Sequence, residues 1–192
     1  MNAVYTICFF IAYPIVRLLF PCRFYGTRNI PAGPAIVCAN HSSFIDPVLI
    51  ALAFGHRRPL HFMAKAELFR VIPFRGLLRA LGAFPIERGE PDIGAVRTAV
   101  RHLKGGRKIM IFPEGTRVAE DESAAPKSGA VRIAAKLGAP VLPIYITTKK
   151  KALRCSRLII GEPFKLHTPA NKDYAPLAAE LMDRILSLEM KR

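Results

Sequence analysis

Short runs of consecutive apolar residues alternate along the chain with stretches in which apolar residues recur every three or four positions. The short runs are typical of strands buried on both faces of a sheet, and the wider spacing is typical of amphipathic helices. The pattern predicts strands at residues 35–39, 60–64, 83–86, 108–112, 141–146 and 158–160, and helices at 47–54, 67–81, 92–104, 129–137 and 177–188. Because strand and helix alternate throughout, we expect a single α/β domain with a mainly parallel sheet flanked by helices.

Two of the predicted helices carry further signals. Asp46 followed by Pro47 is typical of a helix start in which Asp is the N-cap and Pro the first helical residue. Another helix is expected to begin at Asp92 and to end at the glycine pair that follows residue 104. Its spacing predicts an apolar stripe made of Ile93, Val96, Val100 and Leu103.

The first 20 residues are almost entirely apolar, with Arg17 as their only charge. They lack the basic leader and the cleavage pattern of a secretory signal peptide. Pro14 interrupts the stretch, and its uncharged part is short for a straight membrane span of about 20 residues. We therefore expect residues 1–25 to form an apolar, helical membrane anchor that lies in the interface, ahead of an α/β domain at residues 26–192. A short transmembrane helix and a helix packed on the core are the alternatives.

Basic residues dominate the charge, with 29 Lys and Arg against 14 Asp and Glu and a formal net charge of +15. Such a balance is typical of proteins that meet nucleic acid, an anionic membrane surface or an anionic substrate. The first 45 residues contain no acidic residue and are among the most apolar, which favours a membrane phospholipid surface over nucleic acid. A basic module that binds nucleic acid stays as an alternative, although no zinc-finger, helix-turn-helix or RNA-stacking signature accompanies the charge. A second basic cluster at residues 149–151 fits either a solvated loop or contact with lipid or a cofactor.

The four cysteines, Cys8, Cys22, Cys38 and Cys155, are widely spaced and form no Cys-x-x-Cys pair or Cys/His ligand group. Zinc and redox-motif interpretations therefore fail, and we expect no metal. Reduced thiols are typical of a protein in contact with the cytosol, so the expected location is the cytoplasmic face of a membrane. Cys38, three residues before His41, is an alternative nucleophile for a thiol hydrolase or acyl-enzyme transferase, but a cysteine in an apolar strand is usually an inert core residue.

Polar and charged residues follow four predicted strands in turn. In open α/β sheets, ligands bind at the carboxyl ends of the strands. Acids, bases and cations that converge on one edge of the sheet therefore predict an active site for an anionic substrate. The residues at these strand ends are Asn40, His41 and Asp46, then Lys65 and Glu67, then Glu87 and Arg88, and finally Glu114, Thr116 and Arg117.

His41 is the natural general base because an imidazole titrates near neutral pH. Asp46 lies five residues later, which on a regular helix would place it about 140° away on the wrong face. The spacing therefore requires His41 to sit in the loop before a helix, so that Asp46 can fold back, fix the imidazole tautomer and stabilise the imidazolium. The alternative is that Asp46 serves only as an N-cap.

A short loop reads Phe-Pro-Glu-Gly-Thr-Arg and ends at Arg117. Gly115 permits a tight turn that can offer backbone N–H groups to a ligand. Arg117 presents the planar fork that suits phosphate, and Lys65 and Arg88 on neighbouring strand ends can join it in a clamp. The alternative is a polar loop in which Glu114 pairs with Arg117, with the other two cations on the solvated surface.

These blocks resemble the glycerolipid acyltransferases, the family typified by 1-acylglycerol-3-phosphate acyltransferase. The family's His-x-x-x-x-Asp block matches residues 40–46, including the leading Asn, and its Phe-Pro-Glu-Gly-Thr-Arg block matches residues 112–117 without a change. A glycine followed by hydrophobic residues and an arginine at 82–88, and a proline-containing hydrophobic strand at 139–144, complete four blocks in the family's order. The resemblance covers roughly residues 26–146.

The resemblance implies transfer of a fatty acyl group from acyl-CoA or acyl-carrier protein to the 2-hydroxyl of 1-acylglycerol 3-phosphate, giving phosphatidic acid for phospholipid biosynthesis. It implies His41 as the base and Asp46 as the group that orients it, with no cofactor beyond the thioester co-substrate. Glycerol 3-phosphate or another lysophospholipid is the alternative acceptor, and Val118 replaces a serine common in the family, which is expected to affect headgroup preference only. The implied substrate-binding residues are Lys65, Arg88, Glu114, Gly115, Thr116 and Arg117, with the three cations at the phosphate.

Overall fold

The computed structural model describes residues 3–87, 92–118 and 124–190, and it contains one seven-stranded sheet. The strands lie in the order β1-β7-β6-β2-β5-β3-β4, and every neighbouring pair is parallel except β6 and β7. This confirms the predicted α/β domain with a mainly parallel sheet. The strands are β1 (Cys22–Tyr25), β2 (Ala35–Ala39), β3 (Leu60–Lys65), β4 (Phe84–Ile86), β5 (Lys108–Ile111), β6 (Val141–Ile146) and β7 (Ser156–Ile160).

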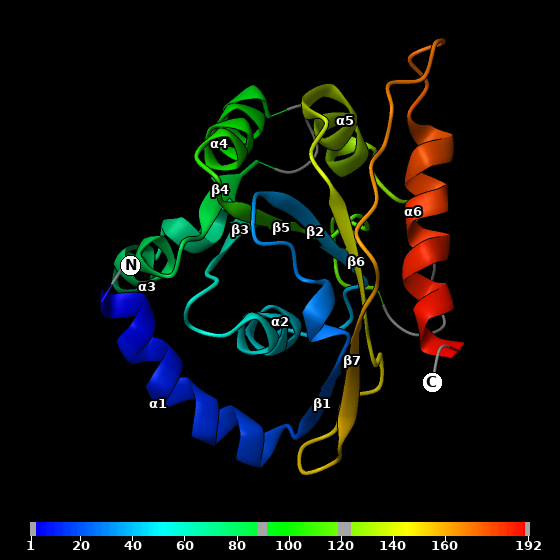
Figure 1. Cartoon of the computed structure of the whole chain (residues 1–192). Coiled ribbons are helices and arrows are strands. Elements are labelled where there is room, and N and C mark those ends of the chain that lie inside the picture. The colour runs from blue at the N-terminus through cyan, green and yellow to red at the C-terminus, as the bar shows by residue number, and fades with distance from the viewer. Residues whose placement is uncertain (1–2, 88–91, 119–123, 191–192) are drawn as a thin grey trace.

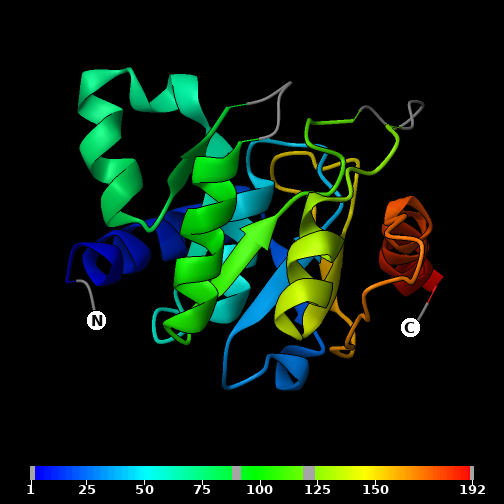
Figure 2. The ribbon, with the colours of Figure 1, turned by 90° about the horizontal axis from the view of Figure 1, so that it is seen from above.

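Helices cover both faces of the sheet. Figures 1 and 2 show α4, α5 and α6 on one face, and α2 with α1 on the other. The α-helices are α1 (Ala3–Leu19), α2 (Asp46–Phe54), α3 (Ile72–Ala80), α4 (Ile93–Lys104), α5 (Gly129–Leu137) and α6 (Ala175–Ser187), with short 3-10 turns at η1 (Thr27–Asn29), η2 (Ala66–Phe69) and η3 (Leu188–Met190).

The central strand β2 shows why these apolar runs become buried strands. All five of its residues are buried, and they alternate between two hydrophobic cores. Ile36 and Cys38 pack in the core under α4, α5 and α6, whereas Val37 and Ala39 pack in the core under α2. Because helices cover both faces of β2, none of its side chains reaches solvent, which explains its uniformly apolar sequence.

The apolar stripe predicted for α4 is confirmed in its second half, where Leu103 is buried and Val100 packs against the core, and is wrong in its first half. Ile93 is 71% exposed and Val96 is 43% exposed, whereas the buried residues are Ala95, Ala99 and Leu103. Alanines let the helix axis approach β4 and β5 closely, so the first turns of the helix face the sheet with Ala95 and Ala99, and Ile93 and Val96 point outward. The predicted start of this helix at Asp92 is confirmed: Asp92 is the N-cap, and its side chain accepts a hydrogen bond from the backbone N–H of Ala95 at 2.8 Å.

The apolar N-terminal stretch forms α1, which lies against α2 and exposes most of its hydrophobic side chains. Tyr5 is the single buried residue of its described span. None of the helices in residues 3–87, 92–118 and 124–190 combines the length and the apolar character needed to cross a membrane. After α1, the chain enters β1, a strand that the sequence pattern did not predict and that pairs with β7.

Gly26 connects β1 to the rest of the domain in a conformation that only glycine adopts without strain. Its φ is +70°, and a Cβ built on it would lie 2.1 Å from the carbonyl oxygen of Ile160. Because the added Cβ would clash with a backbone oxygen, no side-chain rotation can relieve the contact. A side chain at this position is therefore incompatible with the pairing of β1 and β7.

We expect Gly26→Ala to lower the free energy of unfolding by about 2–4 kcal/mol, because it adds left-handed strain to a backbone clash. Thermal unfolding followed by circular dichroism measures the loss. Gly33→Ala is the matched control, because a Cβ at that position would meet nothing within 4 Å. Equal stability of the two variants would show that the turn relaxes without consequence.

Candidate active site

His41 lies in the loop that joins the carboxyl end of β2 to α2, and Asp46 is the first residue of α2. His41 Nδ1 is 3.0 Å from Asp46 Oδ2, and the two side chains are 12% and 0% exposed. A carboxylate at this distance accepts the Nδ1 proton of a neutral imidazole, which leaves the Nε2 lone pair to act as a base. The structure therefore brings the predicted pair into the geometry of a base and its orienting acid.

The backbone of the same loop also holds the Asp46 carboxylate. Oδ2 accepts the backbone N–H groups of Ser42 and Ser43, each at 2.8 Å. Ile45, and not Asp46, occupies the N-cap position of α2, and no cap hydrogen bond forms there. Asp46 is the first helical residue, and its side chain turns back toward the residues before it. The interpretation of Asp46 as a plain N-cap is therefore wrong.

Lys150 is the residue of this site that the sequence did not single out. It comes from the β6–β7 connection, its side chain is 2% exposed, and its Nζ lies 2.8 Å from Asp46 Oδ1. This contact is an ion pair without hydrogen-bond geometry, so Asp46 Oδ1 has no hydrogen-bond partner among the described residues. Lys150 Nζ donates instead to Ser42 Oγ at 2.9 Å and to the Thr147 carbonyl oxygen. Its only sequence signal was membership of the basic cluster at 149–151.

The charge of Asp46 is favoured despite its burial. Burial alone would raise the pKa of this carboxyl, but the hydrogen bond to His41 and the charge of Lys150 hold the pKa below its usual range. Asp46 is therefore a carboxylate at neutral pH. That state is the one that holds the His41 proton on Nδ1 and stabilises an imidazolium.

Two further residues fix the position of His41. The ring of Phe112 stacks on the imidazole with centroids 3.9 Å apart, and Glu114 Oε2 accepts the His41 backbone N–H at 2.7 Å. The buried side chain of Asn40 exchanges two 2.8 Å hydrogen bonds with the backbone of Ile146 and so locks the end of β2 to β6. The leading Asn of the motif thus has a structural role.

Glu114 is the most perturbed acid of the site. Burial, followed by the nearby Asp46 carboxylate, raises its pKa to about 7, although the His41 N–H opposes the shift. The acid is therefore divided between its neutral and charged forms at neutral pH. It bonds to the backbone of His41, not to Arg117, so the alternative Glu114–Arg117 pair is absent from the described contacts.

Gly115 makes the tight turn that the sequence predicted. Its φ is +70°, and its amide donates to the Phe112 carbonyl oxygen at 3.0 Å. The side chain of Lys127 occupies the space where a Cβ would point, at 2.8 Å. Val118 donates its backbone N–H to the His41 carbonyl oxygen at 2.9 Å, a bond that does not depend on its side chain.

The predicted phosphate ligands are only partly assembled. Arg117 is exposed and lies 3.5 Å above the ring of Phe44, which belongs to the same loop as His41. Lys65 pairs with Glu67 at 2.9 Å on the surface. Thr116 is exposed beside Arg117. Arg88 lies outside the described residues.

The structure excludes Cys38 as the nucleophile of a thiol mechanism. Cys38 is completely buried in β2, and burial strongly raises the pKa of its thiol, so it is neither accessible nor ionised. Within the residues that the structure describes, no group of three or more His, Cys, Asp or Glu side chains is arranged to hold a metal ion.

Comparison with known proteins decides the family. The family model described as "Acyltransferase" matches residues 21–147. The chain belongs to this acyltransferase family. The match spans β1 to β6 and therefore contains every site residue described above except Lys150.

Individual relatives extend the match beyond the family region. This acyltransferase is 33% identical over 187 residues to a 1-acyl-sn-glycerol-3-phosphate acyltransferase of Bacillus subtilis, which covers 92% of each chain. It is 32% identical over 122 residues to the Pseudomonas aeruginosa protein of the same name, across 62% of this chain and 46% of that one. A crystal structure of the LPA acyltransferase PlsC from Thermotoga maritima has a TM-score of 0.69 at 23% identity and covers 98% of this chain and 95% of that one, so it shares the fold.

We expect Lys150→Met to destabilise the protein by about 3 kcal/mol near pH 7, because it leaves the Asp46 carboxylate buried without its cation. Asp46 has a depressed pKa, so its stabilising contribution is present above the unfolded-state value near 4 and is lost as pH falls below it. The difference between variant and wild type should therefore shrink in acid. Urea unfolding at pH 7 and near pH 2.5 measures both values.

Lys151→Met is the matched control for this prediction, because Lys151 is exposed and belongs to the same basic cluster. Equal stability of the two variants at pH 7 would show that the Lys150–Asp46 ion pair adds nothing to the fold.

We expect Glu114→Gln to remove a pH dependence of stability. A carboxyl with a folded pKa raised to about 7 contributes stability below its unfolded value, and this contribution is lost as pH rises through 7. Gln keeps the oxygen that accepts the His41 N–H. The variant should therefore gain about 1 kcal/mol over wild type between pH 5 and 8.5, a value reduced for solvent screening. Thermal melts across this range test it, and an unchanged gap, as expected for the exposed Glu162→Gln, would contradict it.

Proposed function

We propose that this protein is a 1-acylglycerol-3-phosphate acyltransferase, which moves a fatty acyl group from a thioester donor to the 2-hydroxyl of 1-acylglycerol 3-phosphate. The observation that carries the proposal is the His41–Asp46 pair, whose nitrogen and oxygen lie 3.0 Å apart. The Bacillus subtilis protein of this name is 33% identical in sequence across 92% of the chain. The product is phosphatidic acid, and the donor is acyl-CoA or acyl-carrier protein. Neither a metal nor a further cofactor enters the proposal.

His41 supplies the proton transfer. Its Nε2 takes the proton of the acceptor hydroxyl as the alkoxide oxygen attacks the thioester carbonyl carbon. The tetrahedral intermediate collapses, the carbon–sulfur bond breaks, and the imidazolium returns the proton to the leaving thiolate. Asp46 lowers the energy of the imidazolium, and its four contacts hold the imidazole in one orientation throughout.

The remaining motif residues serve the acceptor. Arg117 stacks on Phe44, which belongs to the same loop as His41. Its guanidinium fork would contact the acceptor phosphate. Lys65 and Arg88 join it in the proposal as further cations on neighbouring strand ends. Glu114 binds substrate and does not act as a second base, and the Gly115–Thr116 backbone shapes the pocket.

The membrane supplies the lipid substrate, and α1 is the proposed contact with it. The exposed residues of α1 include Ile7, Ile11 and Leu18, which lie along one stripe of the helix. Such a stripe on a helix with little charge suits burial in the interface of a phospholipid membrane. The four free cysteines support a location on the cytoplasmic side.

Acyl transfer by purified protein in detergent tests the reaction. We expect wild type to form phosphatidic acid from 1-acylglycerol 3-phosphate with acyl-CoA or with acyl-carrier protein, and His41→Ala to lower kcat by about 10² or more. His167→Ala, an exposed histidine, is the control and should keep its activity. Near-normal turnover by His41→Ala would overturn the mechanism, and no product with either donor would overturn the acceptor.

Vesicle sedimentation tests the membrane contact. We expect Ile11→Asp with Leu18→Asp to weaken partitioning into phospholipid vesicles at least about tenfold, because two apolar side chains no longer enter the interface. Leu186→Asp with Met190→Asp is the control, since both residues are exposed apolar positions of the C-terminal region. An equal effect in both double variants would show that the loss comes from added negative charge and not from α1.

A further inference from the structure

A cavity of about 670 Å³ lies at the opposite end of the sheet from His41. Its walls include the first residues of β3 and β5 and the residues just before β2 and β4. His41 follows the carboxyl end of β2 and stacks on Phe112, whereas Lys108, four residues earlier on the same strand, lines this cavity. That separation is about 13 Å along the strand, so the cavity is distinct from the candidate active site.

The cavity is strongly basic. Five cations line it, and none of its lining residues in the described chain is acidic. Three separate stretches of the chain contribute these cations, so they do not come together through one local run. The cations are Arg57 and Arg58 between α2 and β3, Arg79 on α3, Arg107 between α4 and β5, and Lys108 on β5.

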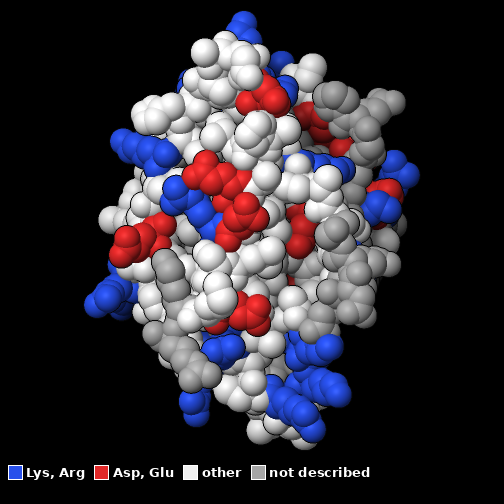
Figure 3. Space-filling model, turned by 90° about the vertical axis from the view of Figure 1, so that its right-hand side faces the viewer, with Lys and Arg blue, Asp and Glu red and all other residues white. Residues whose placement is uncertain are grey.

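The charge is not a general property of the surface. Figure 3 shows the face covered by α6, where acidic side chains lie across the middle and basic ones lie mostly toward the rim. Acidic residues of this region include Glu180, Asp183 and Glu189. The net charge of +15 is therefore unevenly distributed, with one face mixed and five cations around a cavity whose described walls hold no acid.

A buried hydroxyl in the cavity wall has no partner. Tyr5 is 6% exposed and lines the cavity, and its Oη is buried without a hydrogen bond to any described residue. An unmet buried hydroxyl is destabilising, and such groups are rare in native proteins. An anionic oxygen in the cavity would accept its proton.

The two histidines of the wall offer a further donor. The rings of His61 and His102 stack with centroids 4.1 Å apart, and His61 Nδ1 is bonded to the Gly82 carbonyl oxygen at 3.1 Å. Arg107 approaches His102 Nδ1 at 3.3 Å, and since a guanidinium only donates, the proton of a neutral His102 is on Nε2. Burial, with His61 and the nearby arginines, lowers the pKa of His102 to about 4. An anion bound beside these rings would offset the positive charge of the nearby arginines.

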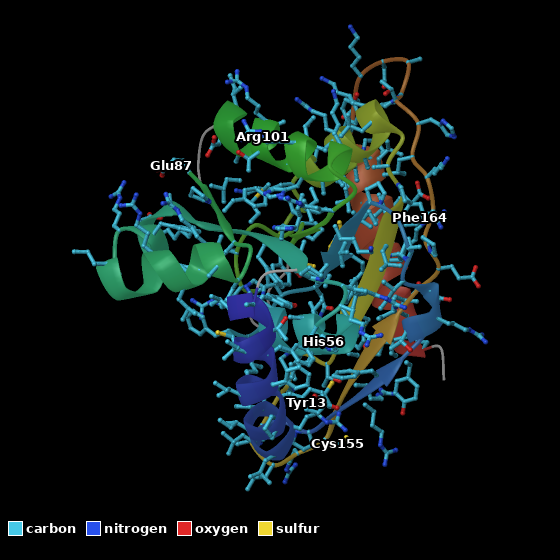
Figure 4. The ribbon with its side chains drawn as sticks, turned by 60° about the vertical axis from the view of Figure 1, so that its left-hand side comes forward. Tyr13, His56, Glu87, Arg101, Cys155 and Phe164 are labelled. Carbon is cyan, nitrogen blue, oxygen red and sulfur yellow. The ribbon has the colours of Figure 1, made fainter. Side chains whose placement is uncertain are left out.

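The neighbours of the cavity indicate which kind of anion it takes. Tyr5 belongs to α1, whose outward face is apolar, and α1 contacts the loop before β3 through Phe9, Phe10 and the labelled His56 (Figure 4). Arg79 belongs to α3, where Ile72 is 87% exposed. Cations beside exposed apolar helices suit a ligand with a charged head and apolar chains.

We propose that this cavity binds the phosphate of an anionic phospholipid headgroup, with Arg58, Arg107 and the Tyr5 hydroxyl among its ligands. The site is separate from acyl transfer and does not rest on the proposed function. It gives the protein a preference for anionic membranes beyond the diffuse attraction of its net charge.

The test uses the full chain in the His41→Ala background, so that no turnover takes place and failure of the proposed reaction leaves the result unaffected. Isothermal calorimetry compares short-chain phosphatidylglycerol below its micelle concentration with short-chain phosphatidylcholine and with inorganic phosphate. We expect binding of phosphatidylglycerol over phosphatidylcholine, and at least about tenfold weaker binding in Arg58→Gln/Arg107→Gln. The control Lys136→Gln/Lys165→Gln removes the same charge from positions outside the cavity and should bind like the parent.

Tyr5→Phe separates a binding role from a structural one. It removes a hydroxyl that has no partner in the free protein, so the ligand-free melting temperature should stay the same or rise, while phosphatidylglycerol binding should weaken several-fold. Equal losses in both charge variants, or equal affinity for the two lipids, would overturn the site. Inorganic phosphate that binds as tightly as phosphatidylglycerol would reject the lipid assignment and show a site for free phosphate.

Discussion

The buried carboxylate of Asp46 is the constraint on which the rest of the site depends. A charge that is 0% exposed must find its partners inside the protein, because an unpaired buried ion is strongly unfavourable. Two backbone amides, the His41 imidazole and the Lys150 ammonium supply them. Each partner also fixes its own segment, so the loop after β2, the start of α2 and the β6–β7 connection have one arrangement that meets the requirement.

The parallel sheet makes this arrangement possible. β2 pairs with β6, so residues that follow the two strands meet at the same edge although they are more than 100 positions apart. The Asn40 side chain closes the end of that pair by bonding both polar groups of the Ile146 backbone. The catalytic geometry therefore follows from strand order and from buried polar contacts together, and neither would suffice alone.

The sequence predicted the elements that follow a regular apolar pattern, and it missed the features that depend on residues distant in the chain. The bounds of α5 and β6 agree with their apolar runs, because both elements are covered by the core along their length. The first half of the α4 stripe was misplaced, since hydrophobic spacing does not say whether alanines or branched residues face a close neighbour. Lys150 was not separated from its basic cluster, because only the folded position of Asp46 distinguishes a buried lysine from a solvated one. β1 was hidden because three of its four residues are charged or aromatic and it directly follows an apolar helix.

The two ends of the sheet handle charge in different ways. At the carboxyl end, the buried Asp46 carboxylate is paired with Lys150, and Arg117 is an exposed cation of the same edge. At the amino end, five cations surround a cavity without an acidic residue among its described walls, and a tyrosine hydroxyl lacks a partner. Mutual repulsion among these cations raises the free energy of the empty state, and a bound anion would remove that repulsion. The buried acid at one end is thus paired with a cation of the fold itself, whereas the cations at the other end have no acid among the described walls of the cavity. There, α1 and the exposed part of α3 bring apolar surface beside them.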